Sequence, residues 1–309
     1  MTRARPPHAR GRASVEVEGR MAVLRDEPAA KLSAFAADID ELLLLMRLSD
    51  VSELAPVVLA VHPNVYRPDD QLVVDLAVLP GLVDAGLVDA TGSVDPQVRQ
   101  WLSALQAPAA EVAIRVFDGD AVLRGAVVRR EELVVVAFRN DDQFTVQGFR
   151  TDREDFESTV VEPLWRVLGA RDPADFESFT VDEGELAEIV ASFDPQVTGA
   201  RGEREVRSRL REHDLSPQTI DVLLDAARYT GRRAEIVYHR ADSSGVRTQA
   251  AWAVGVMDTG AGRVLSTTDR GAQGVLDVTL SPGTRRRFSE GITALVERGG
   301  CRGWFDTTN

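Results

Sequence analysis

The chain has 309 residues, of which 44% are hydrophobic and 28% are charged, and its net charge is −13. This is an ordinary globular composition, and the length allows one large domain or two modest ones with a sizeable core. The negative charge argues against nucleic acid and anionic membrane surfaces as partners, because both bind clustered Lys and Arg.

The cysteine content and the N-terminal region limit the location of the protein. One cysteine, Cys301, excludes an intramolecular disulfide framework, and no apolar run reaches the length of a membrane-spanning helix. The first twelve residues hold four arginines with no apolar stretch after them, unlike a secretory signal. We expect a disordered tail over residues 1–30, a single domain over residues 31–309, either Met1 or Met21 as the start, and a cytoplasmic location.

The first predicted elements are a short strand over residues 32–37 and a helix that begins at Asp38. Glu41 stands three residues after Asp38, which is the spacing of a capping box. Apolar residues follow at helical spacing, and further leucines make the helix apolar nearly all round, so we expect it to be buried. A second helix is predicted where Asp95 is the N-cap and Pro96 the first helical residue.

Residues 110–149 predict a meander of antiparallel strands around which the rest of the chain is arranged. Val112, Ile114 and Val116 alternate with other residues, which is the period of a strand with one buried face. Turns are expected at residues 118–120 and 131–132, before two more apolar segments that end at residue 149. A helical segment is expected to start at Asp152.

The second half of the chain repeats this plan. Glu111 and Arg115 correspond to Glu235 and His239, which stand 124 residues later. The strand and capping box of the first half recur 144 residues later, and the helix start with an N-cap and a proline recurs at Ser216. Phe144, Val146, Phe156, Val160 and Leu164 correspond to Leu276, Val278, Phe288, Ile292 and Val296 at one constant offset of 132. A constant offset across a strand and a helix indicates an internal duplication rather than chance similarity.

The predicted fold class is therefore α+β, with a central antiparallel sheet and pseudo-two-fold symmetry. The half-repeats span about residues 32–170 and 174–300, and each is expected to contain strand, helix, helix, meander and helix. Residues 62–68, a proline-containing loop, are the expected site of an insertion in the first copy. Residues 201–205 are charged, and we expect a solvated loop or an exposed helix there.

Few side chains suggest catalysis or metal binding. The four histidines stand at no metal-ligand spacing from each other, a cysteine or a carboxylate pair, so no metal or cofactor is expected. Ser243 and Ser244 lack the strand-turn-helix setting of a nucleophile elbow, and Asp141 with Asp142 fits a solvated turn. His239 on a strand face is the strongest catalytic candidate, although the sequence places no base or nucleophile beside it.

Several short stretches, taken together and in order, carry a family resemblance. They are residues 81–89, 94–96, 101–102, 110–116, 234–237, 253–254, 258–259, 262–265 and 280–284. These stretches resemble the EspG family, the ESX secretion-associated chaperones of actinobacterial type VII secretion. The resemblance covers roughly residues 32–298 and rests on the number and order of the stretches, since none of them carries chemistry.

The resemblance implies a sheet flanked by two helical bundles in a cytosolic, non-catalytic chaperone. It implies a PE–PPE heterodimer as partner, whose apolar helical PPE tip the chaperone binds and keeps soluble until export. In the family, the loop between the second and third strands helps to grip the partner. The corresponding residues here are the candidate partner-binding residues: Phe117, Asp118, Asp120, Ala121, Val122, Leu123 and Arg124.

Two other classes of function stay open on the sequence alone. One is an enzyme of unknown class with a site between the two halves, and the other is a scaffold or regulatory protein with the same fold. A weak homodimer is also compatible with the sequence. A 1:1:1 complex with a co-expressed PE–PPE pair would distinguish the chaperone from both alternatives.

Overall fold

The computed structural model describes residues 32–64, 67–150, 156–191, 199–228, 231–271, 274–300 and 304. Residues 32–309 form one compact unit, and the fold below is that of this unit alone. The expected tail over residues 1–30, the helix start at Asp152 and the cysteine Cys301 lie outside the described residues.

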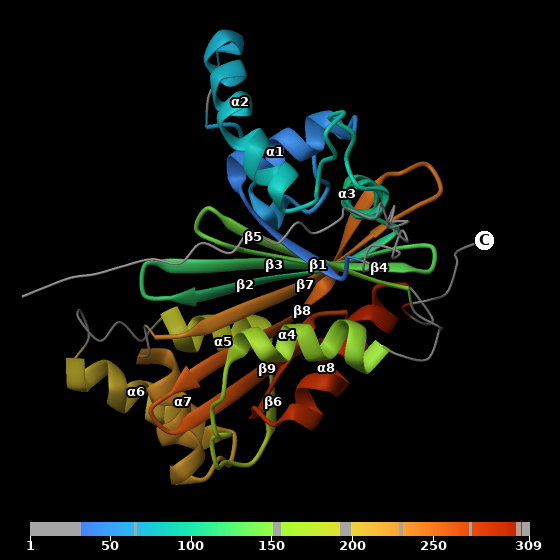
Figure 1. Ribbon diagram of the computed structural model, residues 1–309. Helices are drawn as coiled ribbons and strands as arrows, with labels where there is room; N and C mark the ends of the chain where they lie inside the picture. The colour runs from blue at the N-terminus through green and yellow to red at the C-terminus, as the bar shows by residue number, and fades with distance from the viewer. Residues whose placement is uncertain are drawn as a thin grey trace, which may run out of the picture. The chain divides into compact units, whose positions relative to one another are not determined.

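The described chain is a mixed structure of helices and one large antiparallel sheet (Figure 1). The strands are β1 (Ala34–Asp38), β2 (Ala110–Asp118), β3 (Ala121–Arg130), β4 (Leu133–Asn140), β5 (Gln143–Arg150), β6 (Phe179–Asp182), β7 (Arg233–Ala241), β8 (Arg247–Thr259), β9 (Gly262–Arg270) and β10 (Leu276–Pro282). The helices are α1 (Ile39–Leu48), α2 (Pro68–Asp84), α3 (Pro96–Gln106), α4 (Glu162–Leu168), α5 (Glu183–Ala191), α6 (Gly199–Glu212), α7 (Pro217–Arg228) and α8 (Arg285–Arg298). A 3-10 turn, η1 (Val57–Leu59), precedes α2, and a π-helical turn, η2 (Glu157–Val161), precedes α4.

The strand order in the sheet is β1-β5-β4-β3-β2-β7-β8-β9-β10-β6. The edge strand β1 precedes helices α1–α3 in the chain, and the edge strand β6 precedes helices α5–α7. In each meander the last strand, β5 or β10, lies beside an edge strand, and the first strand, β2 or β7, lies at the centre of the sheet. The two meanders meet where β2 pairs with β7 in antiparallel orientation. The order of strands from β1 to the centre of the sheet therefore matches the order from β6 to the centre.

The register decides which side chains share a face, because residues directly opposite each other in an antiparallel pair point the same way. Glu111 on β2 lies opposite Val128 on β3 and opposite His239 on β7. Val128 packs in the core cluster that contains α1, α2 and α3. Glu111 and His239 therefore lie on the sheet face that these helices cover elsewhere.

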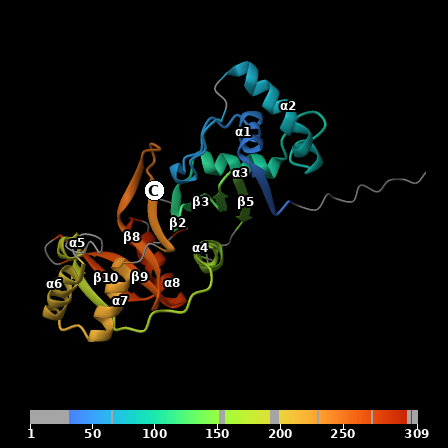
Figure 2. The same cartoon turned by 90° about the vertical axis from the view of Figure 1, so that its left-hand side faces the viewer.

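Two groups of helices cover the two ends of this face. Helices α1–α3 form one apolar core with β1 and β3–β5, and helices α5–α7 form another with β9 and β10. Figure 2 shows the two groups toward opposite edges of the sheet, with α1–α3 near β3 and β5 and α5–α7 near β8–β10. The opposite face of the central strands is covered by η2, α4 and α8, whose core includes Val112, Ile236 and Phe288.

Local sequence signals explain the helix starts. The Asp38 carboxylate accepts from the Glu41 amide at 2.9 Å and the Glu41 carboxylate accepts from the Asp38 amide at 2.9 Å, so the predicted capping box is confirmed. Asp95 caps α3 through the Gln97 amide at 2.7 Å, with proline at the first position.

Two expectations need correction, and a third is settled between its alternatives. Each half has three helices before its meander, not two, because α2 and α6 were not counted among the helices. Residues 201–205, expected as a solvated loop or an exposed helix, lie inside α6 with Arg204 and Glu205 exposed, so the second alternative is confirmed. Residues 117–124 are not a loop: Phe117 pairs with Val122 and Asp118 with Ala121, so only Gly119 and Asp120 form the turn.

The C-terminal aromatic residue Trp304 has a clear place in the core. It is 3% exposed and packs against Phe156 and Tyr238, with ring centroids at 6.1 and 6.4 Å. None of the helices that the structure describes has the length and apolarity needed to cross a bilayer.

Candidate partner-binding site

The β2–β3 hairpin carries the seven predicted partner-binding residues on two faces and at its tip. Strand alternation places Phe117, Val122 and Arg124 on the face shared with Glu111. Leu123 points to the opposite face and packs against the core under α4 and α8. The remaining three, Asp118, Asp120 and Ala121, are exposed at or beside the turn.

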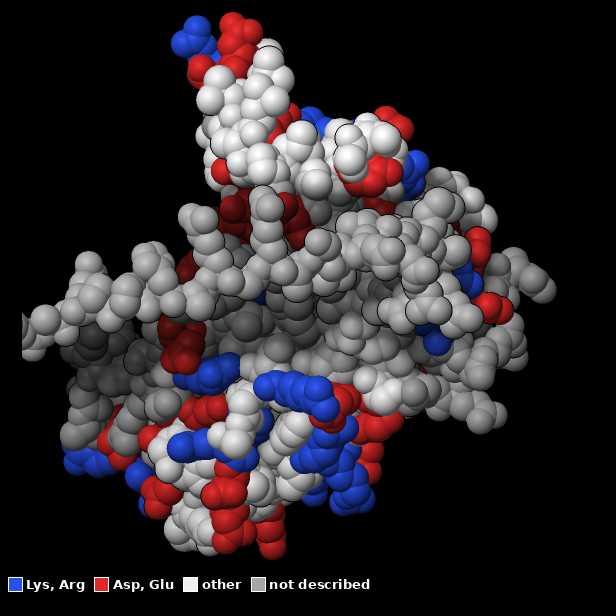
Figure 3. Space-filling model, viewed as in Figure 1, with Lys and Arg blue, Asp and Glu red and all other residues white. Residues whose placement is uncertain are grey.

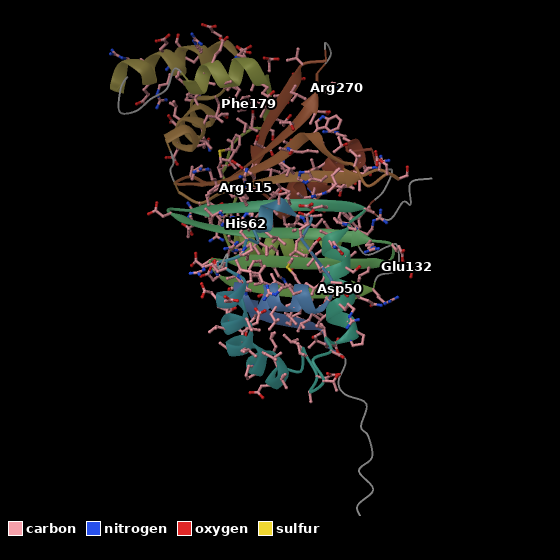
Figure 4. The ribbon with its side chains drawn as sticks, turned by 90° about the horizontal axis from the view of Figure 1, so that it is seen from above. Asp50, His62, Arg115, Glu132, Phe179 and Arg270 are labelled. Atoms are coloured by element: carbon pink, nitrogen blue, oxygen red, sulfur yellow. The ribbon has the colours of Figure 1, made fainter. Side chains whose placement is uncertain are left out.

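The face between the two helix groups is open over β2 and β7, and we call this surface the central groove. It is a hollow of about 380 Å³. Figure 4 shows Arg115 near the middle of the strands, with the two helix groups on either side. The lining includes three predicted residues, Phe117, Val122 and Arg124, together with Val57, Val58, Ala60, Ala113, Arg115, Glu235, Val237, His239 and Gln249.

An apolar hollow of about 430 Å³ adjoins the central groove beneath α5, α6 and α7. Glu235 lines both hollows. The apolar hollow is lined by residues of these helices and of β6–β10, including Phe179, Leu186, Leu210, Leu223 and Met257. A partner that filled both hollows would contact charged and polar side chains in the central groove and apolar side chains in the hollow beneath α5–α7.

The wall of the central groove on the α1–α3 side is the η1 turn. Val57 on this turn is 82% exposed, the highest value among the large apolar side chains that the structure describes. Two arginines hold the turn: Arg139 donates to the carbonyls of Leu59, at 3.1 Å, and Ala60, and Arg247 donates to the Ala55 carbonyl. The wall is thus fixed to β4 and β8 and presents an apolar side chain to solvent.

The floor of the central groove contains a buried carboxylate. Glu111 is 1% exposed and forms an ion pair with Arg247. His239 places Nδ1 3.9 Å from the second oxygen of Glu111. Burial lowers the pKa of His239 below its ordinary value, and a hydrogen bond with Gln249 offsets this in part. Burial therefore favours the neutral imidazole form of His239 at neutral pH.

Arginines surround Phe117 at the hairpin end of the central groove. The Arg115 and Arg233 guanidinium carbons lie 5.7 and 4.6 Å from the centre of the Phe117 ring. Arg115 also forms an ion pair of 2.8 Å with Glu235 across β2 and β7. This end of the groove is therefore richer in positive charge than the acidic chain as a whole. The Phe117 ring makes cation–π contacts with both guanidinium groups.

The other chemical candidates are accounted for by turns. Asp242 accepts from the Ser244 amide at 2.8 Å and hydroxyl at 2.6 Å, which is a capped turn and not an activated nucleophile. Asp141 has a φ of +51° in the β4–β5 turn, and Asp142 is an exposed neighbour. Over the part of the chain that the structure describes, no three His, Cys, Asp or Glu side chains are grouped as metal ligands.

Sequence reasoning missed the η1 wall, both arginines that hold it and the apolar hollow. Residues 57–61 were too short and too uniformly apolar to assign by periodicity. Arg247 and Ala55 are 192 positions apart in the chain, so no local pattern reports their contact. The echo of Arg115 in His239 was the one signal that pointed to this face.

Comparison with known proteins agrees with these observations. The model of the EspG family matches residues 38–294. The ESX-1 secretion-associated protein EspG1 of Mycobacterium tuberculosis H37Rv is 26% identical over 257 residues, which are 82% of this chain and 83% of that protein. The ESX-3 secretion-associated protein EspG3 of Mycolicibacterium smegmatis is 28% identical over 261 residues, 81% of this chain and 82% of that protein.

A solved structure shares the fold. The Mycobacterium tuberculosis type VII secretion system chaperone EspG5, in complex with a PE25-PPE41 dimer, matches with a TM-score of 0.70 at 18% identity. The match covers 86% of this chain and 96% of EspG5. The described chain therefore shares its overall fold with that structure.

Proposed function

The chain belongs to the EspG family, and on that premise we propose that it is a cytoplasmic chaperone of type VII secretion. It binds the apolar helical tip of the PPE-type protein in a PE–PPE heterodimer and keeps that tip soluble until export. The relative EspG5 was solved with such a dimer, which supports the same class of partner for this chain. Binding and release are the whole of this activity, with no chemical step.

The central groove is the observation that carries this proposal. A helix tip that must be kept from aggregating needs a rigid surface with apolar centre and polar rim. The groove supplies an exposed Val57, the Phe117 ring and Val122 over a sheet that is packed on its other face. The adjoining apolar hollow beneath α5–α7 extends this surface for apolar side chains of the tip.

The structure narrows the proposed contact residues. Phe117, Val122 and Arg124 line the groove and are proposed to touch the partner directly. Asp118, Asp120 and Ala121, exposed at the hairpin end, are proposed to contact it from the rim. Leu123 is proposed to support the hairpin from its core side instead of binding, because it packs under α4 and α8.

We assign no catalytic role to His239 or to its neighbours. A general base needs a substrate proton within reach and a pKa near the working pH. His239 has its lowered pKa and its hydrogen bond to Gln249, but its closest carboxylate is committed to Arg247. The cluster fits a structural role, in which it ties β2, β7 and β8 to the wall of the groove.

We also infer that residues 31–309 are one domain made by duplication of a half-domain with its own helical bundle. The 124-residue offset equates Glu111 with Glu235 and Arg115 with His239. Across β2 and β7, Glu111 lies opposite His239 and Arg115 opposite Glu235, as a two-fold axis requires. Ala113 is opposite Val237, its own equivalent at that offset, so the axis passes between these two residues.

Co-expression tests the proposed function. The full chain, produced with a PE–PPE pair from the same organism, should co-purify as a 1:1:1 complex, and the pair should aggregate without it. Free PE–PPE protein that stays monodisperse alone, together with no complex at micromolar concentration, would overturn the proposal. A matched preparation of the Val122→Asp variant should give less complex at the same expression level.

A further inference from the structure

Helix α2 carries an apolar face that the fold leaves uncovered. Four of the eight exposed large apolar side chains among the described residues lie on it: Leu72 at 59% exposure, Val73 at 66%, Leu76 at 63% and Val83 at 37%. Ala77 and Pro80 are exposed beside them. Together they form a stripe about 17 Å long and about 140° wide on the helix, and we call it the α2 stripe.

The opposite side of α2 is firmly held, so the stripe is not exposed by a loose helix. Leu82 is 1% exposed in the α1–α3 core, and Val78 and Leu79 pack against it. Asp75 accepts from Arg47 on α1 and from Gln71 at 2.9 Å. Helix α2 thus buries one side and presents the other, as a recognition helix does.

Pro80 adds an apolar ring to the stripe. Leu76 and Pro80 both lie on the exposed side, about one helical turn apart. A partner bound along the stripe can therefore pack against both side chains.

The charges at the ends of the stripe are mainly acidic. Asp69 and Asp70 stand at its start beside Arg67, and Asp84 follows Val83 at its end. Figure 3 shows the surface over α2 as mostly uncharged, with charged side chains toward its outer end. A second copy of the chain is disfavoured as the occupant, because both parallel and antiparallel pairing of two α2 helices bring acidic ends together.

A hollow of about 820 Å³ continues the stripe at its C-terminal end. Val83 belongs to both, and Val88 and Val94 add apolar lining. Asp89 stands at this hollow, and hydrogen bonds from the Thr91 hydroxyl and the Ser93 amide hold its pKa below its ordinary value. The hollow therefore keeps a negative charge beside apolar surface at neutral and mildly acidic pH.

We propose that the α2 stripe docks an amphipathic helix of a second protein whose apolar face is flanked by Arg or Lys at both ends. The apolar side chains of that helix cover the stripe and enter the hollow, and its basic groups meet Asp69, Asp70 and Asp84. None of the stripe residues lines the central groove, so the chaperone can hold this helix and its PE–PPE client together.

A designed helix tests this surface. Two synthetic peptides of about 18 residues share one leucine stripe and differ only in Arg or Glu at the flanking positions. Fluorescence anisotropy should show the Arg peptide binding at least tenfold more tightly than the Glu peptide at about 0.1 M salt. Replacing Leu72→Ser and Leu76→Ser should weaken binding of the Arg peptide at least tenfold, whereas Val246→Ser, an equally exposed apolar residue elsewhere, should not.

Several results would overturn this proposal while leaving the client groove untouched. They are equal binding of the two peptides, binding that survives the double serine variant, and a dimer of the chain that the double variant dissolves. The double variant should still form the PE–PPE complex. Loss of that complex would assign the α2 stripe to the client site instead.

Discussion

Val122 and Leu123 are neighbours on β3 whose side chains point to opposite faces of the sheet. Val122 lines the central groove and Leu123 packs against the core under α4 and α8. We predict that Val122→Asp weakens client binding about tenfold, or about 1.4 kcal/mol, without changing the melting temperature. Leu123→Asp should instead lower the free energy of unfolding by about 1–3 kcal/mol, because it places a charge against apolar side chains.

Calorimetric titration with a PE–PPE pair and thermal melts of both variants check this difference. Val122→Ala is the matched control, since it removes apolar contact without adding charge and should weaken binding less. A Val122→Asp protein that binds normally and melts early would show that this residue belongs to the core and that the groove does not receive the client.

Arg247 is predicted to be important for stability because it neutralises a buried carboxylate. Its removal in Arg247→Ala leaves Glu111, which is 1% exposed, without its ion-pair partner, and also frees the Ala55 carbonyl. We expect a loss of about 3–5 kcal/mol in the free energy of unfolding. The double variant Glu111→Gln with Arg247→Met should recover part of that loss, as urea unfolding can measure; a loss equal to or larger than that of Arg247→Ala would contradict the pairing.

His239 makes stability depend on pH in a defined window. Its pKa is lowered in the folded protein by burial, so below the ordinary value of 6.5 the unfolded chain binds a proton that the folded chain resists. Stability is therefore unaffected by this group above about pH 7 and falls as the pH drops through 6.5 toward the folded pKa. The slope from one proton is at most about 1.4 kcal/mol per pH unit.

Urea unfolding of the wild type and of His239→Gln between pH 7.5 and 5.5 measures this contribution. The variant should show the shallower dependence on pH over that range. Identical slopes would mean that His239 titrates normally and that the groove floor is open to water.

At the scale of elements, helices α1 and α5 begin with the same sequence pattern but have different capping hydrogen bonds. Asp38 caps α1 in a reciprocal box with Glu41, whereas the equivalent Asp182 accepts from the Glu185 amide at 3.1 Å and the Glu185 side chain binds His213 at 2.9 Å instead. We predict that Asp38→Ala costs about 1–2 kcal/mol and Asp182→Ala less, because only the first cap satisfies two amides reciprocally. Chemical denaturation of each variant tests this order, and equal or reversed costs would contradict it.

The sequence predicted those elements whose signals are local. Capping residues, proline at the first helical turn and strand alternation depend on neighbours a few positions apart, and α1, α3 and the meander β2–β5 follow from them. Helix α2 was missed because it is apolar on its exposed side as well as its buried one, so no amphipathic period stands out. Residues 201–205 in α6 were left open between a loop and an exposed helix, because glycines such as Gly202 weaken a helix.

The hairpin shows where transfer from a family can mislead. The resemblance placed a gripping loop at residues 117–124, but the strands extend to the turn and pair throughout. The β-strand period then divides the predicted residues between two faces, which no loop would do. The resemblance thus gave the region, and only the register gave the side chains that face the groove.

At the scale of the whole molecule, the order of strands in the sheet explains why a groove exists. The two meanders meet where β2 pairs with β7, and helices α1–α3 and α5–α7 pack over strands nearer the two outer edges of the sheet. The central strands between the helix groups stay open on one face, while α4 and α8 close the other. The residues that build the groove wall come from positions up to 192 apart, so this feature follows from topology and not from any local pattern.

Hydrogen exchange of the full chain, with and without a purified PE–PPE heterodimer, tests most directly whether the central groove receives the client. The account predicts slower exchange in the β2–β3 hairpin, the η1 turn and the α5–α7 lining, and unchanged exchange in α2. Protection confined to α2, or none over β2, β3 and η1 in a complex shown by light scattering to be 1:1:1, would contradict it.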